Sequence, residues 1–411
     1  MIGPYLLDWL NLLFRWAHLI AGISWIGASF YFVWLDDSLS APENPDDVRR
    51  GMSGELWAVH GGGFYHNQKF PTGPRGAPLT DDLHWFKWEA YATWITGMAM
   101  LAIVYWAGAS TFLIDKSVLD LTPPAAISLS IATLIGGWLG YDLLCRIFAS
   151  RPALLWTTVA AFLLALDWAL FHVFGGRAAY IHVGSVIGTI MVANVAMVII
   201  PGQRRMLAQI RAGREPDPRP GRLGKMRSVH NTYLTLPVLF IMISNHYPMT
   251  YGGPNGWLVL AAISAAGVLV RRFFVLSHKH RYVVGLPVAA AIVLAVVAIA
   301  LRPQAPASAP HGVETTTVKG RVEHIVINYA SVRPIIAQRC AVCHAAKPTQ
   351  PGFTTAPAGV FLDTPEHVQA NASRIEAQAV ATHAMPLGNV THMTDNERAW
   401  LGAWINTGAR I

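Results

Sequence analysis

Long apolar runs recur along the first 301 residues and are separated by shorter polar segments. A helix needs about 20 consecutive apolar residues to cross a bilayer, and these runs reach that length. The pattern predicts eight spans, at 6–35, 86–108, 123–143, 152–174, 179–200, 229–247, 255–276 and 282–301. The remaining chain has the mixed pattern of a soluble module. The predicted fold class is therefore mainly α, a polytopic membrane helix bundle followed by a small all-α domain.

A change in composition marks the boundary between these two parts. The segment from Arg302 to Pro310 is rich in proline and alanine, which is typical of an extended tether. We therefore divide the chain into a membrane domain at 1–301, a linker at 302–319 and a soluble domain at 320–411. Near its end, Thr394 followed by Glu397 forms a capping box that predicts a helix through Ile405.

Composition and charge support a membrane protein. Only 13% of the residues are charged and 53% are hydrophobic, whereas soluble domains average roughly 25% charged residues. The net charge of +8 raises the question of nucleic acid. The basic residues, however, gather between Arg204 and Arg227, directly after an apolar run, as in a cytoplasmic loop. No basic groove with interleaved aromatic residues is apparent, so we exclude a nucleic-acid partner.

The same basic loops set the orientation. The segments 204–227 and 271–281 carry the positive charge that marks the cytoplasmic side, and the loop 114–120 carries little. Alternating eight spans from these markers places both termini outside the cytoplasm. The prediction is a multi-pass protein of the bacterial inner membrane whose soluble domain lies on the periplasmic side.

The soluble domain contains Cys340-Ala-Val-Cys343-His344, the attachment signature of a c-type haem. Each thiol forms a thioether to a haem vinyl group, and the histidine then binds the iron. A zinc site would need a second cysteine pair, which the chain lacks. The sequence therefore predicts one covalent haem c held by Cys340, Cys343 and His344, and hence a cytochrome c domain.

A second iron ligand is expected further along the chain. Met385 lies in a proline-bounded turn and is the predicted sixth ligand, with Met393 as the competing methionine. A thioether ligand raises the reduction potential relative to bis-histidine ligation, which suits an electron acceptor. The iron ligands are therefore predicted to be His344 and Met385. Because haem is attached covalently on the periplasmic side in bacteria, this site agrees with the orientation above.

Histidines inside spans are functional candidates because buried polar groups are costly in a membrane. In the first span, Gly22 and Trp25 share a helix face with His18. The glycine leaves room for a flat macrocycle, or equally for a neighbouring helix. His182 and His246 lie toward the periplasmic ends of their spans, and His230 lies at a cytoplasmic end. Facing histidines hold haem in helix bundles, so His18, His182 and His246 are candidate ligands of a b-type haem. The alternative role for each is a hydrogen-bonded packing residue.

The loop between the first two spans is long enough to be functional. Its segment 54–65 combines three consecutive glycines, which permit close backbone approach, with Trp57 and other aromatic residues that can stack on a heterocycle. A glutamate and a histidine in this segment can move protons. The predicted catalytic residues are Glu55, His60, Phe64 and Tyr65. The alternative is an interfacial turn with aromatic anchors.

Several segments together resemble one family over essentially the full length. They are 15–36, 54–65, 230–237 and 245–248, with the haem motif and Met385-Pro386. The chain resembles the bacterial membrane-bound urate oxidase (urate hydroxylase) that carries a C-terminal cytochrome c domain. This resemblance implies oxidation of urate to 5-hydroxyisourate, with electrons passed to haem c instead of forming hydrogen peroxide. An external acceptor, such as a soluble cytochrome or a terminal oxidase, would then drain the haem.

Two other functions remain open. One is a membrane cytochrome that only carries electrons, for instance from quinol to a soluble acceptor, and the other is a haem-gated sensor or transporter. The predicted topology adds a requirement to the enzyme hypothesis. If urate reacts in the segment 54–65 on the cytoplasmic side, electrons must cross the bilayer to haem c, and the layered histidines are the candidate relay.

Overall fold

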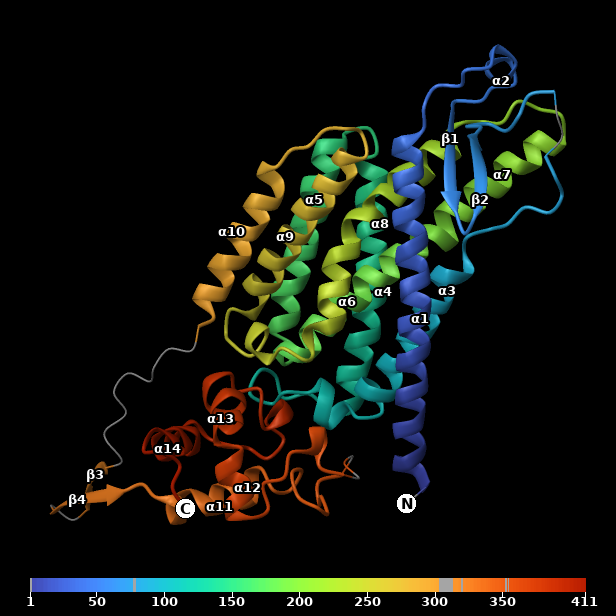
Figure 1. The fold of residues 1–411 in the computed structure, drawn as a ribbon. Coiled ribbons are helices and arrows are strands. Elements are labelled where there is room, and N and C mark those ends of the chain that lie inside the picture. The colour runs from blue at the N-terminus through green and yellow to red at the C-terminus, as the bar shows by residue number, and fades with distance from the viewer. Residues whose placement is uncertain (1, 77–78, 303–312, 319–320, 352, 354) are drawn as a thin grey trace.

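The computed structural model describes residues 2–76, 79–302, 313–318, 321–351, 353 and 355–411. Long helices form a bundle up to Leu301, and a smaller helical module packs against one end of it (Figure 1). A two-stranded sheet projects at the opposite end. We refer to the two ends of the bundle as the module end and the hairpin end.

The first helix, α1 (Ile2–Ser38), runs from the module end to the hairpin end (Figure 1). The chain then forms α2 (Pro45–Arg49), β1 (Gly54–His60) and β2 (Gly63–Lys69). It returns along α3 (Trp88–Met100) and two π-helical segments, η1 (Leu101–Trp106) and η2 (Ala109–Leu113). The η2 segment therefore lies at the module end.

The other bundle helices alternate in direction, because short loops join antiparallel neighbours. They are α4 (Pro123–Ile147), α5 (Pro152–Phe171), α6 (Gly176–Ala193), α8 (Arg219–Ser244), α9 (Gly256–Ser277) and α10 (Gly285–Ala300). The π-helical segment η3 (Asn194–Ile199) joins α6 to α7 (Ile200–Arg211), which extends beyond the bundle at the hairpin end (Figure 1). A short 3₁₀ turn, η4 (Pro248–Thr250), precedes α9.

Within the described residues, five helical stretches are long and apolar enough to cross a membrane. They are Leu6–Ser38, Pro123–Ile147, Pro152–Phe171, Gly176–Arg211 and Gly256–Ser277. The other three predicted spans fall on shorter or more polar helices: α3 with η1, the second half of α8, and α10. Their crossing of a bilayer, and hence the number eight, remains a prediction.

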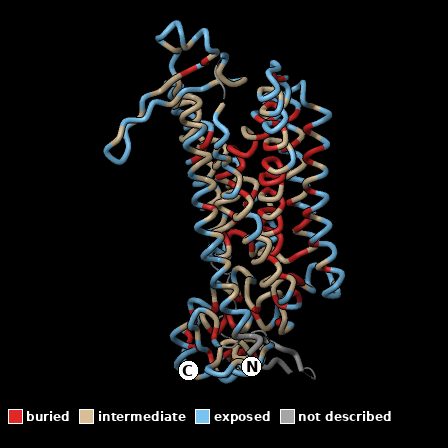
Figure 2. Tube along the Cα trace, turned by 90° about the vertical axis from the view of Figure 1, so that its right-hand side faces the viewer, coloured by how far each residue is buried: buried red, intermediate tan, exposed pale blue. Residues whose placement is uncertain are grey.

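Helix α6 lies at the centre of the bundle, where buried residues are concentrated (Figure 2). It is apolar nearly all round, as expected for a helix enclosed by others. Glycines allow its neighbours to approach closely. A Cβ placed on Gly184 would lie 2.6 Å from Cγ2 of Ile241, and one on Gly137 would lie 2.5 Å from Cγ1 of Val186. The register of α6 against α4 and α8 therefore depends on these two glycines.

The C-terminal module has a separate core. Its helices are α11 (Tyr329–Arg339), α12 (Pro365–Ala370), α13 (Ala372–Ile375) and α14 (Asp395–Asn406), with short turns η5 (Pro357–Gly359), η6 (Glu376–Ala381) and η7 (Leu387–Asn389). Thr394 and Glu397 form a capping box at the start of α14, which confirms the predicted helix. Trp404 is only 1% exposed and belongs to the core of the module.

Strands precede this module, although the sequence predicted an all-α domain. β3 (Val313–Val318) pairs antiparallel with β4 (Arg321–Val326). Their β-branched residues favour a paired strand over a helix. The predicted linker, 302–319, falls largely outside the described residues, and its described part includes β3.

Candidate functional site

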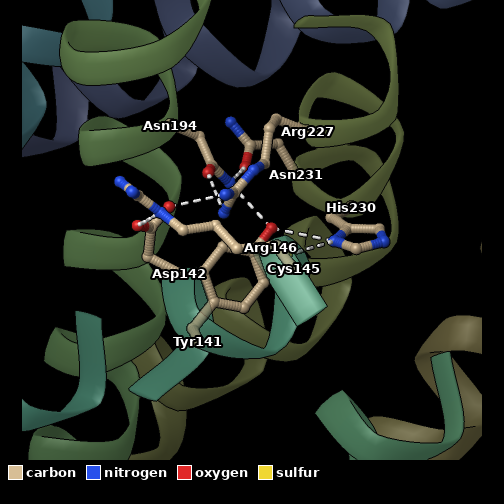
Figure 3. Close-up of polar contacts among 8 residues, drawn as sticks. All are labelled: Tyr141, Asp142, Cys145, Arg146, Asn194, Arg227, His230 and Asn231. Carbon is tan, nitrogen blue, oxygen red and sulfur yellow. Dashed lines mark hydrogen bonds and ion pairs between the residues drawn. The ribbon is translucent and has the colours of Figure 1, made fainter. Parts of the chain in front are cut away.

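A buried polar network crosses the bundle toward the hairpin end. It joins α4, η3 and α8 through the eight residues drawn in Figure 3: Tyr141, Asp142, Cys145, Arg146, Asn194, Arg227, His230 and Asn231. On α4 the members recur after one helical turn, from Tyr141 and Asp142 to Cys145 and Arg146, and on α8 Arg227 is followed one turn later by His230 and Asn231, so each set lies along one side of its helix. Such a concentration of buried polar groups among apolar helices indicates a functional site.

An ion-paired carboxylate forms one side of this network. The Arg227 Nη2 atom donates to Asp142 Oδ1 at 2.5 Å, and Arg146 Nε donates to Asp142 Oδ2 at 2.6 Å. The side chain of Arg227 is 5% exposed, whereas that of Arg146 is 76% exposed. Two cations therefore share one anion, which leaves excess positive charge beside the network.

Asn194 connects the ion pairs to the rest of the network. It is fully buried and is the first residue of η3. Its Oδ1 accepts from Arg227, and its Nδ2 donates to Asn231 Oδ1 at 2.8 Å and to the Tyr141 hydroxyl at 3.1 Å. Single π-helical turns inside α-helices are frequent at functional sites. Here the π turn begins at the residue that holds the network together.

His230 ends the network at an open cleft. Its Nδ1 lies 2.8 Å from the Tyr141 hydroxyl, and its ring lies 4.3 Å from that of Trp156. His230 and Trp156 both line a cleft of about 490 Å³ between the start of α8 and the loop from α4 to α5. Since Nδ1 is held by tyrosine, Nε2 remains for a ligand.

A second cleft, of about 510 Å³, lies on the other side of Trp156. Volumes of this size are typical of small-molecule sites. Basic residues line both clefts: Arg219 and Arg222 in the first, and Lys225, Arg272 and Lys279 in the second. Asp36 and Asp37 pair with Lys225 and Lys279. Within the described part of the chain, no ion pair joins Arg222 or Arg272 to a carboxylate. The clefts therefore suit a flat, anionic ligand.

The predicted catalytic segment forms a β-hairpin, where the sequence suggested a glycine loop. Gly61 and Gly62 have φ of +58° and +81° and make the two-residue turn between β1 and β2. Strand alternation places Glu55 and Phe64 on one face of the hairpin and His60 and Tyr65 on the other. The structure therefore does not gather these four side chains around one point.

The hairpin side chains are also largely open to solvent. Phe64 is 77% exposed and Tyr65 is 53% exposed. Glu55 pairs with His66 at 2.6 Å, and His66 stacks on Trp57 at 4.4 Å. The Glu43 backbone N–H and the His66 imidazole hold the pKa of Glu55 below its usual range. Glu55 is thus engaged in holding the hairpin, and the predicted catalytic role of the segment remains a prediction.

The three candidate ligands of a b-type haem have different surroundings. His18 Nδ1 contacts Thr93 O at 2.9 Å and Thr96 Oγ1 at 3.1 Å. His182 is fully buried, with Nε2 at 2.7 Å from Ser130 Oγ and Nδ1 at 2.7 Å from Ala178 O. His246 is exposed. Both ring nitrogens of His182 are engaged and its ring packs against Phe174, so His182 has no nitrogen left for iron. Nε2 of His18 has no such contact among the described residues, and a b-type haem held without His182 remains a prediction.

The donor set of the C-terminal module does fit a covalent haem. Cys340 and Cys343 are free thiols in a turn after α11, and His344 N donates to Cys340 O. The Nδ1 atom of His344 lies 3.0 Å from Val360 O, which leaves Nε2 for iron. Burial lowers the pKa of His344, so the imidazole stays neutral as a ligand must.

The two methionines differ in position. Met385 is partly buried and packs at the edge of the module core, whereas Met393 is 3% exposed and belongs to the core. The edge position suits an iron ligand, so Met385 remains the predicted one. In the described residues, no group of three or more histidine, cysteine, aspartate or glutamate side chains is arranged for a metal ion.

Sequence reasoning placed His230 at the end of a span but did not select it as a catalytic or haem-binding residue, and it missed the partners of His230. Asp142, Arg227 and Asn194 lie in predicted spans or at their ends, where a charged residue is itself a signal. That signal was available for Asp142 and Arg227. Asn194 carries no charge, and only the fold brings it beside Arg227.

Comparison with known families gives one match. The family model described as "Urate oxidase N-terminal" matches residues 4–302, which is the whole bundle. Searches of curated proteins and of solved structures give no match.

Proposed function

The chain belongs to the urate oxidase N-terminal family, and on this premise we propose that it oxidises urate to 5-hydroxyisourate at the cleft beside His230. The lining of this cleft is the observation that supports the proposed location of the reaction. It combines an aromatic ring, unpaired arginine and a histidine whose second nitrogen is held by tyrosine. The four predicted catalytic side chains of the hairpin do not meet around one point.

The cleft offers the contacts that urate needs. Urate is a flat purine that is anionic near neutral pH. Trp156 provides a ring for stacking, and Arg222 provides planar N–H donors for an anionic oxygen. Positive charge left by the two arginines on Asp142 adds attraction for the anion. The substrate would lie with its edge toward His230.

The reaction releases two electrons and two protons: urate and water give 5-hydroxyisourate, 2 H⁺ and 2 e⁻. His230 Nε2 is the proposed proton acceptor. For this role Nδ1 must carry hydrogen and donate it to the Tyr141 oxygen, which also accepts from Asn194. In this tautomer the Tyr141 oxygen stabilises the imidazolium that forms.

The electrons are proposed to leave through the C-terminal module. A haem c bound by Cys340, Cys343, His344 and Met385 supplies a one-electron acceptor there. The bundle is proposed to lie in the bacterial inner membrane with the module on the periplasmic side. An external one-electron acceptor, such as a soluble cytochrome or a terminal oxidase, would drain the module between transfers.

A pair of histidine variants tests the location. His230→Gln should lower kcat for urate by about a hundredfold, a typical contribution of a general base. His60→Gln, on the exposed hairpin turn, should leave kcat unchanged. Urate consumption by purified protein with ferricyanide as acceptor provides the measurement. The opposite result would move the reaction to the hairpin and restore the predicted role of His60.

A second experiment tests the reaction itself. Urate mixed anaerobically with oxidised protein should produce the absorption bands of a reduced c-type haem. If dithionite reduces the haem and urate does not, the protein is a carrier cytochrome and the proposed function is wrong.

A further inference from the structure

The turn η7, two residues after Met385, lies directly against the bundle. A Cβ on Gly388 would lie 2.8 Å from the Ile114 carbonyl oxygen and 3.1 Å from that of Thr111. Both carbonyls belong to η2 or the residue after it. We propose that η7 on η2 is the contact through which electrons leave the bundle for the haem of the module. This inference rests on the proposed function.

Two further contacts fix the module on the same surface. A Cβ on Gly252, in the loop before α9, would lie 2.4 Å from the Thr382 carbonyl oxygen of the module. The ring of Phe112, in η2, lies 6.2 Å from that of Phe353. Three separate points on the module therefore meet the η2 segment and the adjacent loop, which is enough to define one orientation.

Charge across the contact supports the same orientation. Arg398 of α14 is 5% exposed and donates to the Met385 carbonyl at 2.7 Å. Asp115 of the bundle follows Ile114, whose carbonyl oxygen faces Gly388. The backbone of the predicted iron ligand is thus held by an arginine of the module, and a carboxylate of the bundle lies next to the contact.

The bundle side of the contact continues inward. Arg177, at the start of α6, lies 5.5 Å from the centre of the Phe112 ring, and its Nε donates to Asn245 at the end of α8. Phe112 therefore lies between Arg177 of the bundle and Phe353 of the module. The haem accepts one electron at a time, whereas each urate releases two. Each urate therefore requires two transfers to the haem, and an external acceptor must reoxidise the haem between them.

Matched glycine variants separate this contact from local strain. Gly388 and Gly359 both have positive φ, +56° and +64°, and both lie in short turns of the module. A Cβ on Gly359 meets nothing within 4 Å. Gly388→Ala and Gly359→Ala therefore share the backbone strain, and only the first forces the module away from η2.

The test combines amide exchange with electron transfer in the full-length, haem-loaded protein. In Gly388→Ala, the amides of 111–115 should lose protection from hydrogen exchange, and urate-driven haem reduction should slow by about tenfold, a factor within the range of overpacking penalties. Gly359→Ala should change neither. Dithionite-reduced spectra should match in both variants, which shows equal haem loading.

A second pair of glycine variants tests the contact from the bundle side. Gly252→Ala should reproduce the effect of Gly388→Ala, whereas Gly253→Ala should not, because a Cβ there meets nothing within 4 Å. Slowed haem reduction with unchanged ferricyanide-linked urate oxidation supports the proposal. Lost exchange protection with an unchanged haem reduction rate would overturn it. Failure of urate to reduce the wild-type haem would refute the proposed function, and the exchange data would still report whether η7 docks on η2.

Discussion

Asp142 accepts hydrogen bonds from two arginines that differ mainly in burial. Arg227 approaches it inside the bundle, and Arg146 approaches it from the surface. A buried ion pair is strongly destabilised when one partner is removed, because the other charge is left without compensation. An exposed pair contributes little. The same carboxylate therefore allows the two situations to be compared directly.

We expect Arg227→Leu to lower the free energy of unfolding by about 1–3 kcal/mol, because Arg146 still compensates Asp142 while Asp142 Oδ1 and Asn194 Oδ1 lose their buried donor. Arg146→Leu should lower it by about 0–1 kcal/mol, because the exposed guanidinium is screened by solvent. Denaturant unfolding of the two variants in the same detergent provides the comparison. Equal losses would mean that burial does not distinguish the two pairs.

Asp363 contacts the segment that follows the haem motif, and its ionisation should make the stability of the module depend on pH. It accepts from the Ala346 N–H at 2.9 Å and from His367, and these contacts hold the pKa of Asp363 below its ordinary value of 3.8. A lowered pKa gives stabilisation that is complete above pH 3.8 and is lost as the pH falls through the folded-state value.

The loss of module stability below pH 3.8 should therefore be smaller in Asp363→Asn. The amide oxygen can still accept from Ala346 and does not titrate. The thermal unfolding midpoint of the haem bands, measured from pH 5 downward, gives the comparison. An identical acid profile in both proteins would show that other carboxylates control this range.

At the scale of single residues, the sequence indicated which residue types could be functional, but it did not indicate which residues contact each other. Periodicity placed His230 at the start of a span, and its chemistry made it a candidate. Its contact with Tyr141 joins residues 89 positions apart, and no local pattern encodes that distance. The haem motif was easier, because Cys340, Cys343 and His344 are all within five consecutive residues.

Among the elements, α6 depends most on small residues. The close approach of Ile241 to Gly184 leaves no room for a methyl group, whereas a Cβ on Gly188, one turn further along, meets nothing within 4 Å. The close approach of α8 thus requires glycine at position 184, whereas no such contact requires glycine at position 188.

Gly184→Ala should destabilise the bundle by about 1–3 kcal/mol through overpacking. Gly188→Ala should be neutral or stabilising by up to about 1 kcal/mol, because alanine has the higher helix propensity. Unfolding in detergent would measure both. If Gly184→Ala proved as stable as Gly188→Ala, the register of α6 against α8 would not depend on this contact.

The elements themselves follow from the sequence to different degrees. Apolar length located helices in each predicted range, and the capping box located α14. The β1–β2 hairpin was missed because three glycines suggested an open loop, whereas two of them form a tight turn that pairs the flanking segments. β3 and β4 were missed because the proline-rich stretch before them suggested a tether through residue 319.

At the scale of the whole molecule, the hydrogen-bond partners of His18 and His182 bear on how many haems each chain binds. Ser130 and Ala178 occupy both ring nitrogens of His182, whereas Thr93 contacts only Nδ1 of His18, so His18 remains a candidate ligand for a b-type haem beside the covalent haem c. Pyridine haemochrome spectra of purified protein, before and after acid–acetone extraction, would measure the two haem types. An extractable b-type haem would support the predicted relay, and its absence would leave no carrier between His230 and the module.

The length of α8 has a consequence for energy conversion. His230 near its middle and Ser244 at its end are 14 residues apart, or about 21 Å at the rise of an α-helix. On the proposed assignment, electrons removed beside His230 emerge at the module end while the protons stay behind. Turnover would thus separate charge across the bilayer, against or along a membrane potential worth about 2.3 kcal/mol per charge per 100 mV. In proteoliposomes, urate-driven haem reduction should slow under a potential of one sign and accelerate under the other. A rate that does not change with the potential would place the urate oxidation and the haem on the same side of the bilayer.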